Sequence, residues 1–369
     1  MSVQKTVFIS YRRTNYYMAQ SVYAKLRTNG YDAFLDYQSL DSGDFSQSLL
    51  TQIAARAHFV VILTPSALER CVSSDDWMRR EIEYAIEQKR NVIPLLFEGF
   101  SFDDVKDYLV SDWLKMLPDY NGLRIPDDYF DEAMARLCGT RYLDRDVETV
   151  LHPVAAQAAK AALAAQKQVD EAPAPTPEQL EAEKLFESGF RKSRLLTDFD
   201  GAIEDFTRVI SLRPNDTDAY HRRGRAFWNK GDTGKALHDL ETALKLNPDD
   251  QHVHIIRSGI AHLEGNFKLA LAEADAGVSL TPDYYEAYIQ RGFVRAVTGD
   301  LSGAIADYSD VIRLNSQYAL AYYNRGQARY NQRNFDQAIA DYEAALQIDP
   351  NHALAKQNLE NARQMKAKQ

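Results

Sequence analysis

The chain has 369 residues, 45% of them hydrophobic and 26% charged, a composition typical of a soluble globular protein with room for two or three domains. Its formal net charge of −10 argues against a primary role on nucleic acid, where a basic surface is expected. The two cysteines, Cys71 and Cys138, have no paired spacing, so neither a disulfide framework nor a zinc site is predicted. The first residues lack a secretion signal, and no apolar run is long enough to span a bilayer. We therefore expect a cytoplasmic protein without membrane or nucleic-acid partners.

Short apolar runs alternate with helical segments up to about Tyr142. The expected strands are residues 7–9, 33–35, 58–63 and 91–97, and the expected helices are residues 16–28, 46–57, a helix near Trp77 and a helix-rich end. Such alternation predicts a parallel α/β sheet covered on both faces. A ligand of such a sheet binds at the carboxyl ends of the strands.

Polar and aromatic side chains collect at those carboxyl ends. The residues expected there are Tyr11, Arg12, Arg13, Asp36, Trp77 and Glu81. Two arginines, aromatic rings and carboxylates suit an anionic ligand that carries a sugar and a flat ring, such as a dinucleotide. None of the 17 glycines is two residues from another, so the Gly-x-Gly phosphate fingerprint is absent. A nucleotide would therefore be held by side chains, as a substrate.

The helix near Trp77 carries the candidate reactive group. Its apolar stripe consists of Met78, Ile82, Ala85 and Ile86, and Ser73 or Ser74 is positioned to cap it. Trp77 and Glu81 are four residues apart and so share one face of the helix. An aromatic plane can stack a flat ring while a neighbouring carboxylate stabilises a developing positive charge. Spacing alone also fits an ordinary amphipathic surface helix with a boundary tryptophan and a solvated glutamate.

These motifs, in this order, resemble the TIR (Toll/interleukin-1 receptor) domain, and most of all the NAD-hydrolysing TIR domains of bacteria and of the animal axon-degeneration enzyme. The resemblance covers about residues 4–142. It is carried by residues 8–13, 34–36, 59–65 and 91–94 together with Leu40, Gly43, Phe45, Trp77 and Glu81. It implies a flavodoxin-like α/β fold and NAD+ as a substrate, with no separate cofactor and no metal ion. The segment between Leu68 and Trp77 is shorter than in the animal enzyme.

The resemblance also implies roles for single residues. The family's catalytic glutamate corresponds to Glu81, and its stacking aromatic to Trp77. The further candidates for substrate binding are Tyr11, Arg12, Arg13, Asp36 and Phe45, with Arg12 or Arg13 on the diphosphate. The structural alternatives are a solvated strand end for the arginines, capping or loop bracing for Asp36, and packing for Phe45. The family's gating and self-association loop falls on residues 37–45, including Leu40, Asp41 and Gly43.

A change of composition separates this domain from the rest of the chain. Residues 144–180 form an Ala/Pro-rich linker, in which residues 155–165 favour an exposed spacer helix and Pro173, Pro175 and Pro177 favour an extended stretch. We expect a domain boundary without chemistry here. The predicted domains are residues 1–143, the linker over 144–180, and residues 181–369.

The last part has a 34-residue period. Alanines recur at 202, 236, 270, 304 and 338, an acidic residue follows each by three positions, and prolines stand at 214, 248, 282 and 350. This pattern resembles the tetratricopeptide (TPR) repeat and predicts five helix pairs over about 183–352, closed by a capping helix over 353–368. Such pairs stack into an all-α superhelix whose concave face suits a peptide or protein partner. The arginines at 223, 257, 291 and 325 are expected to be structural, as is common in this repeat.

The resemblance to NAD-hydrolysing TIR domains implies that this chain is an enzyme of NAD+ breakdown, with a role in defence or cell-death signalling. The reaction would be NAD+ glycohydrolysis to nicotinamide and ADP-ribose or a cyclic ADP-ribose isomer. Self-association of the TIR domain would activate it, the repeats would regulate it, and bacterial antiphage defence would be its setting. Two alternatives remain at this stage. One is a non-catalytic TIR–TPR signalling scaffold, and the other is a TIR enzyme that makes a nucleotide messenger for a separate effector.

Overall fold

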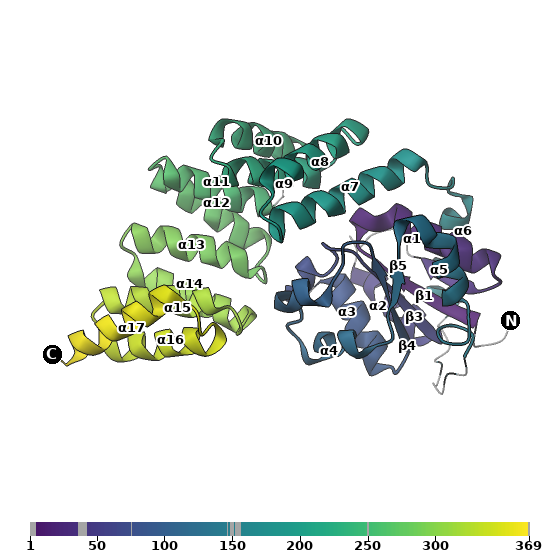
Figure 1. Cartoon of the computed structure of the whole chain (residues 1–369), viewed down its shortest axis with the longest axis horizontal. Coiled ribbons are helices and arrows are strands. Elements are labelled where there is room, and N and C mark those ends of the chain that lie inside the picture. The colour runs from purple at the N-terminus through teal and green to yellow at the C-terminus, as the bar shows by residue number, and fades with distance from the viewer. Residues whose placement is uncertain are drawn as a thin grey trace. The chain divides into compact units, whose positions relative to one another are not determined.

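A computed structural model describes residues 5–35, 43–74, 76–145, 147, 151, 156–248 and 251–367 of the chain (Figure 1). Contacts divide the chain into two compact units, Met1–Pro214 and Asn215–Gln369. The first unit holds the sheet and the first two helices of the repeat region, and the second holds the remaining helices. This division reflects compactness, and the three segments expected from the sequence stay a prediction.

The sheet of the first unit has five parallel strands in the order β2-β1-β3-β4-β5. The strands are β1 (Thr6–Ser10), β2 (Asp32–Leu35), β3 (His58–Leu63), β4 (Asn91–Phe97) and β5 (Leu123–Ile125). This is the flavodoxin-like order, in which the chain changes direction across the sheet between β1 and β3. Sequence patterns predicted the parallel sheet but only four strands. They missed β5 because its three residues include the exposed Arg124 and so lack an apolar run.

Helices cover both faces of the sheet (Figure 1). They are α1 (Tyr16–Thr28), α2 (Gly43–Ala54), α3 (Trp77–Glu87), α4 (Asp112–Lys115) and α5 (Phe130–Leu137), with 3-10 turns at Arg13–Asn15, Glu69–Val72, Phe102–Tyr108, Leu117–Asp119 and Asp127–Tyr129. Val7 and Ile9 point into the core shared with α1 and α5. Phe8 points to the other face, where its ring stacks on Phe34 and Phe59. The strands are buried on both faces, as a parallel sheet requires.

Three helices continue the first unit beyond the sheet. They are α6 (Ala156–Glu171), α7 (Pro177–Arg194) and α8 (Phe199–Leu212). Helix α6 covers most of the expected spacer segment and extends beyond it to Glu171, where Val169 is buried in the core that also contains residues of the sheet. Thr176 and Gln179 form a capping box at the start of α7, with Pro177 at its first position. Figure 1 shows α7 beside α1.

The second unit consists of stacked helices. They are α9 (Thr217–Asn229), α10 (Thr233–Leu246), α11 (Gln251–Leu263), α12 (Phe267–Leu280), α13 (Tyr285–Val297), α14 (Leu301–Leu314), α15 (Ala319–Asn331), α16 (Phe335–Ile348) and α17 (Ala353–Lys366). The odd-numbered helices begin 34 residues apart, as the sequence period predicts. The repeated glycines permit close helix contacts, because a Cβ at Gly292 would lie 2.9 Å from the ring of Tyr308. Every helix in the described ranges is too short or too polar to cross a bilayer.

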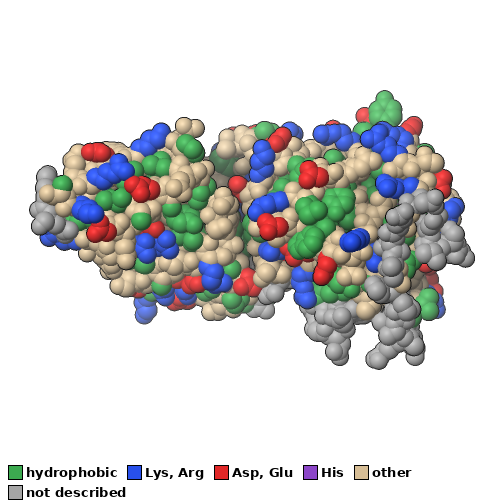
Figure 2. All heavy atoms as spheres, turned by 90° about the horizontal axis from the view of Figure 1, so that it is seen from below, with side chains coloured by type: hydrophobic (Ala, Val, Ile, Leu, Met, Phe, Trp, Pro, Cys, Tyr) green, Lys and Arg blue, Asp and Glu red, His purple; other side chains and the backbone are tan. Residues whose placement is uncertain are grey.

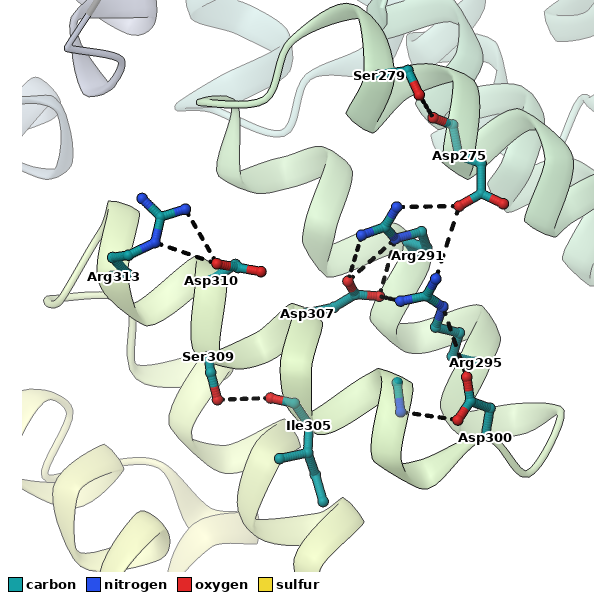
Figure 3. Close-up of polar contacts among 11 residues, drawn as sticks. Asp275, Ser279, Arg291, Arg295, Asp300, Ile305, Asp307, Ser309, Asp310 and Arg313 are labelled. Carbon is teal, nitrogen blue, oxygen red and sulfur yellow. Dashed lines mark hydrogen bonds and ion pairs between the residues drawn. The ribbon is translucent and has the colours of Figure 1, made fainter.

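The arginines of the 34-residue frame are paired inside the array. Arg291 on α13 lies 2.7 Å from Asp307 on α14 and 3.1 Å from Asp275, and Arg295 also binds Asp307 (Figure 3). The corresponding acidic residues pair with Arg223, Arg257 and Arg325. These guanidinium groups therefore join helices, as expected for structural arginines. On the surface in Figure 2, blue and red side chains are interspersed among hydrophobic ones.

Candidate functional site

Helix α3 presents the candidate catalytic residue. It begins at Trp77, and its N-cap is Asp76, whose carboxylate accepts a hydrogen bond from the backbone N–H of Arg79 at 3.0 Å. The expected cap at Ser73 or Ser74 is therefore wrong. An aspartate next to the first helical residue satisfies the free N–H groups directly. The predicted apolar stripe is buried, with Met78, Ile82, Ala85 and Ile86 all against the core.

Glu81 is held at the carboxyl end of β1. The Ser10 hydroxyl donates a hydrogen bond of 2.6 Å to Oε2 of Glu81, and both side chains are buried, 1% and 8% exposed. A short hydrogen bond from a neutral hydroxyl to a carboxylate is charge-assisted and fixes the direction of the carboxylate. Ser10 pairs with Val61 in β3, so the contact lies at the β1/β3 crevice, where sheets of this strand order bind ligands.

Arg12 binds the N-cap residue of α3. Its guanidinium lies 2.5 Å from Asp76 and also donates to the backbone carbonyl of Ala67 at 2.8 and 2.9 Å. Burial alone would raise the pKa of the Asp76 carboxyl, but the adjacent Arg12 cation lowers it below its usual range. Burial raises the pKa of the neighbouring Cys71 thiol, which keeps that thiol protonated and unreactive. The guanidinium of Arg12 is therefore occupied by contacts with Ala67 and Asp76 inside the domain.

Arg13 differs from Arg12 in its surroundings. It is exposed at the first position of the turn Arg13–Asn15, and its guanidinium has no partner among the described residues. Tyr11 is half-buried, with its ring 6.1 Å from that of Tyr16. Arg13 is therefore the cation of this pair that is available to a ligand.

Trp77 is half-buried and stacks with a cation. The guanidinium carbon of Arg80 lies 4.4 Å from the centre of the Trp77 ring, so one face of the indole is covered. Sequence patterns assigned no role to Ser10 or Arg80, whereas Asp76 was expected to suit the positive end of the helix dipole. The three-residue spacing of Trp77 and Arg80 on a helix was a usable signal for the stacked pair. No local pattern indicated Ser10.

The remaining predicted positions belong to the segment before α2. Asp36, Leu40 and Asp41 lie outside the described residues, as does the side chain of Phe45. Gly43 and the backbone of Phe45 are in the first turn of α2, so the helix begins three residues before the expected position. Across the described ranges, no three His, Cys, Asp or Glu side chains gather as metal ligands.

Comparison with known families identifies both parts of the chain. Residues 7–138 match the TIR domain, while residues 196–261, 298–333 and 319–352 match tetratricopeptide repeats. The chain is a TIR domain followed by TPR repeats. The match to the TIR domain spans all five strands and ends at the carboxyl end of α5.

Curated relatives resemble the TIR domain alone. The NAD(+) hydrolase tir-1 of Caenorhabditis elegans is 38% identical over 141 residues, which are 37% of this chain and 14% of that protein. The NAD(+) hydrolase sarm1 of Drosophila melanogaster is 34% identical over 135 residues, 36% of this chain and 10% of that protein. The chain therefore spans about a tenth to a seventh of the length of these relatives.

Solved structures resemble the repeat part. The TPR protein TTC0263 of Thermus thermophilus is 20% identical, with a TM-score of 0.44, over 49% of this chain and 98% of that one. The first TPR of Spaghetti (RPAP3), bound to an HSP90 peptide, is 24% identical with a TM-score of 0.31, over 32% of this chain and 93% of that one. These likenesses concern the fold only.

Proposed function

We propose that this protein is an NAD+ glycohydrolase that cleaves the bond between nicotinamide and ribose. The observation that carries the proposal is the buried Glu81 carboxylate, fixed by Ser10 at the β1/β3 crevice and one helical turn from Trp77. The similarity of the TIR domain to proteins named as NAD(+) hydrolases supports the same substrate.

The chemistry requires few groups. Nicotinamide in NAD+ is already a cationic leaving group, so its departure needs no general acid. The ribose carbon then passes through an oxocarbenium-like state, as in glycoside hydrolysis. A carboxylate beside the ribose stabilises that positive charge, and we assign this role to Glu81. Water or an internal nucleophile of the substrate completes the reaction, to give ADP-ribose or a cyclic isomer.

The other residues are assigned to binding. Trp77 stacks a ring of the substrate on the face that Arg80 leaves uncovered. The exposed Arg13 binds the diphosphate, whereas Arg12 supports the start of α3. Tyr11, Asp36 and Phe45 stay proposed substrate contacts. No metal ion or additional cofactor enters this mechanism.

The test measures NAD+ consumption and nicotinamide release by chromatography. The wild-type chain is compared with Glu81→Gln, which removes the charge but keeps the shape. Glu87→Gln is the matched control, because Glu87 is an exposed glutamate on the same helix. We expect release by wild type and control and a loss of at least about a hundredfold in Glu81→Gln. Equal release by all three proteins would contradict the assignment of Glu81.

The same experiment separates the alternatives. A messenger-producing enzyme would yield a nucleotide product other than ADP-ribose or its cyclic isomer, which mass spectrometry of the products would identify. A non-catalytic scaffold would release no nicotinamide, with or without a crowding agent. If assembled protein also releases no nicotinamide, the proposed enzyme activity is contradicted.

Assembly and regulation are part of the proposal. We propose that the TIR domain self-associates through the segment with Leu40, Asp41 and Gly43, and that a head-to-tail contact extends into a filament. The repeats would receive a protein or peptide partner on their concave face, in the setting of antiphage defence. Light scattering tests the first point, because rapid hydrolysis by a monomer would contradict activation by self-association.

A further inference from the structure

The N-terminus of α1 is bound by a carboxylate from the repeat region. Glu183 on α7 is 1% exposed and accepts hydrogen bonds of 2.8 Å from the backbone N–H groups of Tyr17 and Met18. Backbone N–H groups in the first turn of a helix lack partners within the helix, so a hydrogen-bond acceptor from another element satisfies them. Asn15 occupies the N-cap of α1 but makes no cap with its own side chain. Helix α7 therefore caps α1.

A second carboxylate lies one turn further along α7. Glu187 accepts hydrogen bonds from the side chain of Asn15 at 2.8 Å, and from the hydroxyl and backbone N–H of Ser66 at 2.7 and 2.8 Å. Thr64 also donates to Asn15 at 3.1 Å. Across the described residues, Glu187 pairs with no lysine or arginine, so neutral donors alone satisfy its charge. Loss of the carboxylate would leave buried donors without an acceptor, which is costly.

Ser66 connects this cluster to the candidate site. The next residue, Ala67, accepts two hydrogen bonds from the guanidinium of Arg12. The same guanidinium binds Asp76, the N-cap of α3. A continuous set of hydrogen bonds and one peptide link therefore runs from Glu187 to the helix that carries Trp77 and Glu81.

Helix α7 is also tightly joined to α8. A Cβ at Gly189 would lie 2.9 Å from the ring of Phe206, and Asp205 on α8 binds both Ser188 and Lys192 on α7. From α8 the chain continues directly into the second unit at Asn215. A displacement of α8 would therefore move α7, and with it the two buried carboxylates.

We infer that α7 is the coupling element of this protein: Glu183 and Glu187 bind it to a surface of the TIR domain, and Glu187 positions α3 through Ser66 and Arg12. That surface consists of the N-terminus of α1, Asn15 and Ser66, and it fits a helix that presents two carboxyl groups one turn apart. The effect of this coupling on hydrolysis rests on the proposed function, in which the repeats regulate the TIR domain. Glu187 is a positioning residue, not a catalytic one.

The test follows hydrogen exchange in the full chain. The backbone N–H groups of Arg79 and Arg80 both bond to Asp76, so their exchange reports how firmly the start of α3 is held. The variant is Glu187→Gln, which places an amide donor against the donors of Asn15 and Ser66. The control is Glu181→Gln, the same change at an exposed position of α7. Ser66→Ala removes one donor and serves as a milder second variant.

We expect about tenfold faster exchange at Arg79 and Arg80 in Glu187→Gln, a smaller increase in Ser66→Ala, and no change in the control. We also expect a lower kcat for NAD+ with little change in KM. Faster exchange at Tyr17 and Met18 with unchanged exchange at Arg79 and Arg80 would overturn the inference. If Glu187→Gln does not fold, Ser66→Ala decides by the same criterion. Absence of hydrolysis by wild type would remove the proposed function, while the exchange result would still decide the coupling.

Discussion

The Ser10 hydroxyl donates a 2.6 Å hydrogen bond to the Glu81 carboxylate across 71 positions of sequence. The bond joins the end of β1 to α3 and fixes one oxygen of the carboxylate. Ser10 lies in the same strand end that leads to Arg12, which holds Asp76 at the start of α3. Two contacts from one strand end therefore determine where Glu81 lies.

Ser10→Ala should lower kcat about tenfold to a hundredfold with a smaller effect on KM, because a hydrogen bond to a charged group contributes about 1.5–3 kcal/mol. The measurement is steady-state NAD+ hydrolysis. If Ser10 acts through Glu81, its substitution should have no further effect in a Glu81→Gln background. Additive losses in the double variant would mean that Ser10 acts independently.

Substitution of Arg12 should affect stability, whereas substitution of Arg13 should affect substrate binding. Arg12→Met leaves the Asp76 carboxylate buried without its cation and should destabilise the fold by about 3–5 kcal/mol. Arg13→Met should leave stability within about 0.5 kcal/mol and raise KM for NAD+. Urea unfolding and hydrolysis kinetics measure the two effects. An unchanged KM in Arg13→Met would remove Arg13 from the substrate site.

Glu183 should make stability depend on pH. Burial raises the pKa of its carboxyl from 4.5 to about 8, although the N–H groups of Tyr17 and Met18 and the nearby Arg213 favour the ionised form. Between these values the folded chain holds a proton that the unfolded chain has lost. The free energy of unfolding therefore falls as pH rises from about 5 to about 8.

Glu183→Gln should flatten this dependence, because glutamine does not titrate. Urea unfolding of wild type and variant across the same pH range measures the difference. The control is Glu181→Gln, whose curve should run parallel to that of wild type. A Glu183→Gln curve that also runs parallel to wild type would show that the pKa of Glu183 is not raised in the fold.

The ion pairs in Figure 3 offer a matched comparison in the repeats. Asp307 is 2% exposed and keeps Arg295 as a second cation, so Arg291→Met should lower stability by about 1.5–3 kcal/mol through the lost hydrogen bonds to a charged group. Arg313 and Asp310 form an exposed pair, and Arg313→Met should cost less than about 1 kcal/mol. Thermal unfolding followed by circular dichroism measures both. Equal costs would mean that burial does not determine the strength of these pairs.

Local patterns were sufficient for the architecture. The 34-residue spacing predicted the stacked helices because each repeat contacts mainly its neighbours, so the pattern recurs with every unit. Strand and helix alternation predicted the parallel sheet, since each buried strand needs an apolar run. No apolar run marks β5, because the exposed Arg124 interrupts this strand of three residues.

The sequence by itself determined a TIR-like sheet with Glu81 and Trp77 on one helix, followed by TPR repeats, because these features depend on periodicity and on motifs within short segments. The tertiary structure alone decided the partners of those residues. Ser10 beside Glu81, Arg12 on Asp76, and Glu187 on Asn15 join positions separated by 71, 64 and 172 residues. Such contacts arise when distant elements pack and buried polar groups must find partners, and that requirement leaves no local pattern in the chain.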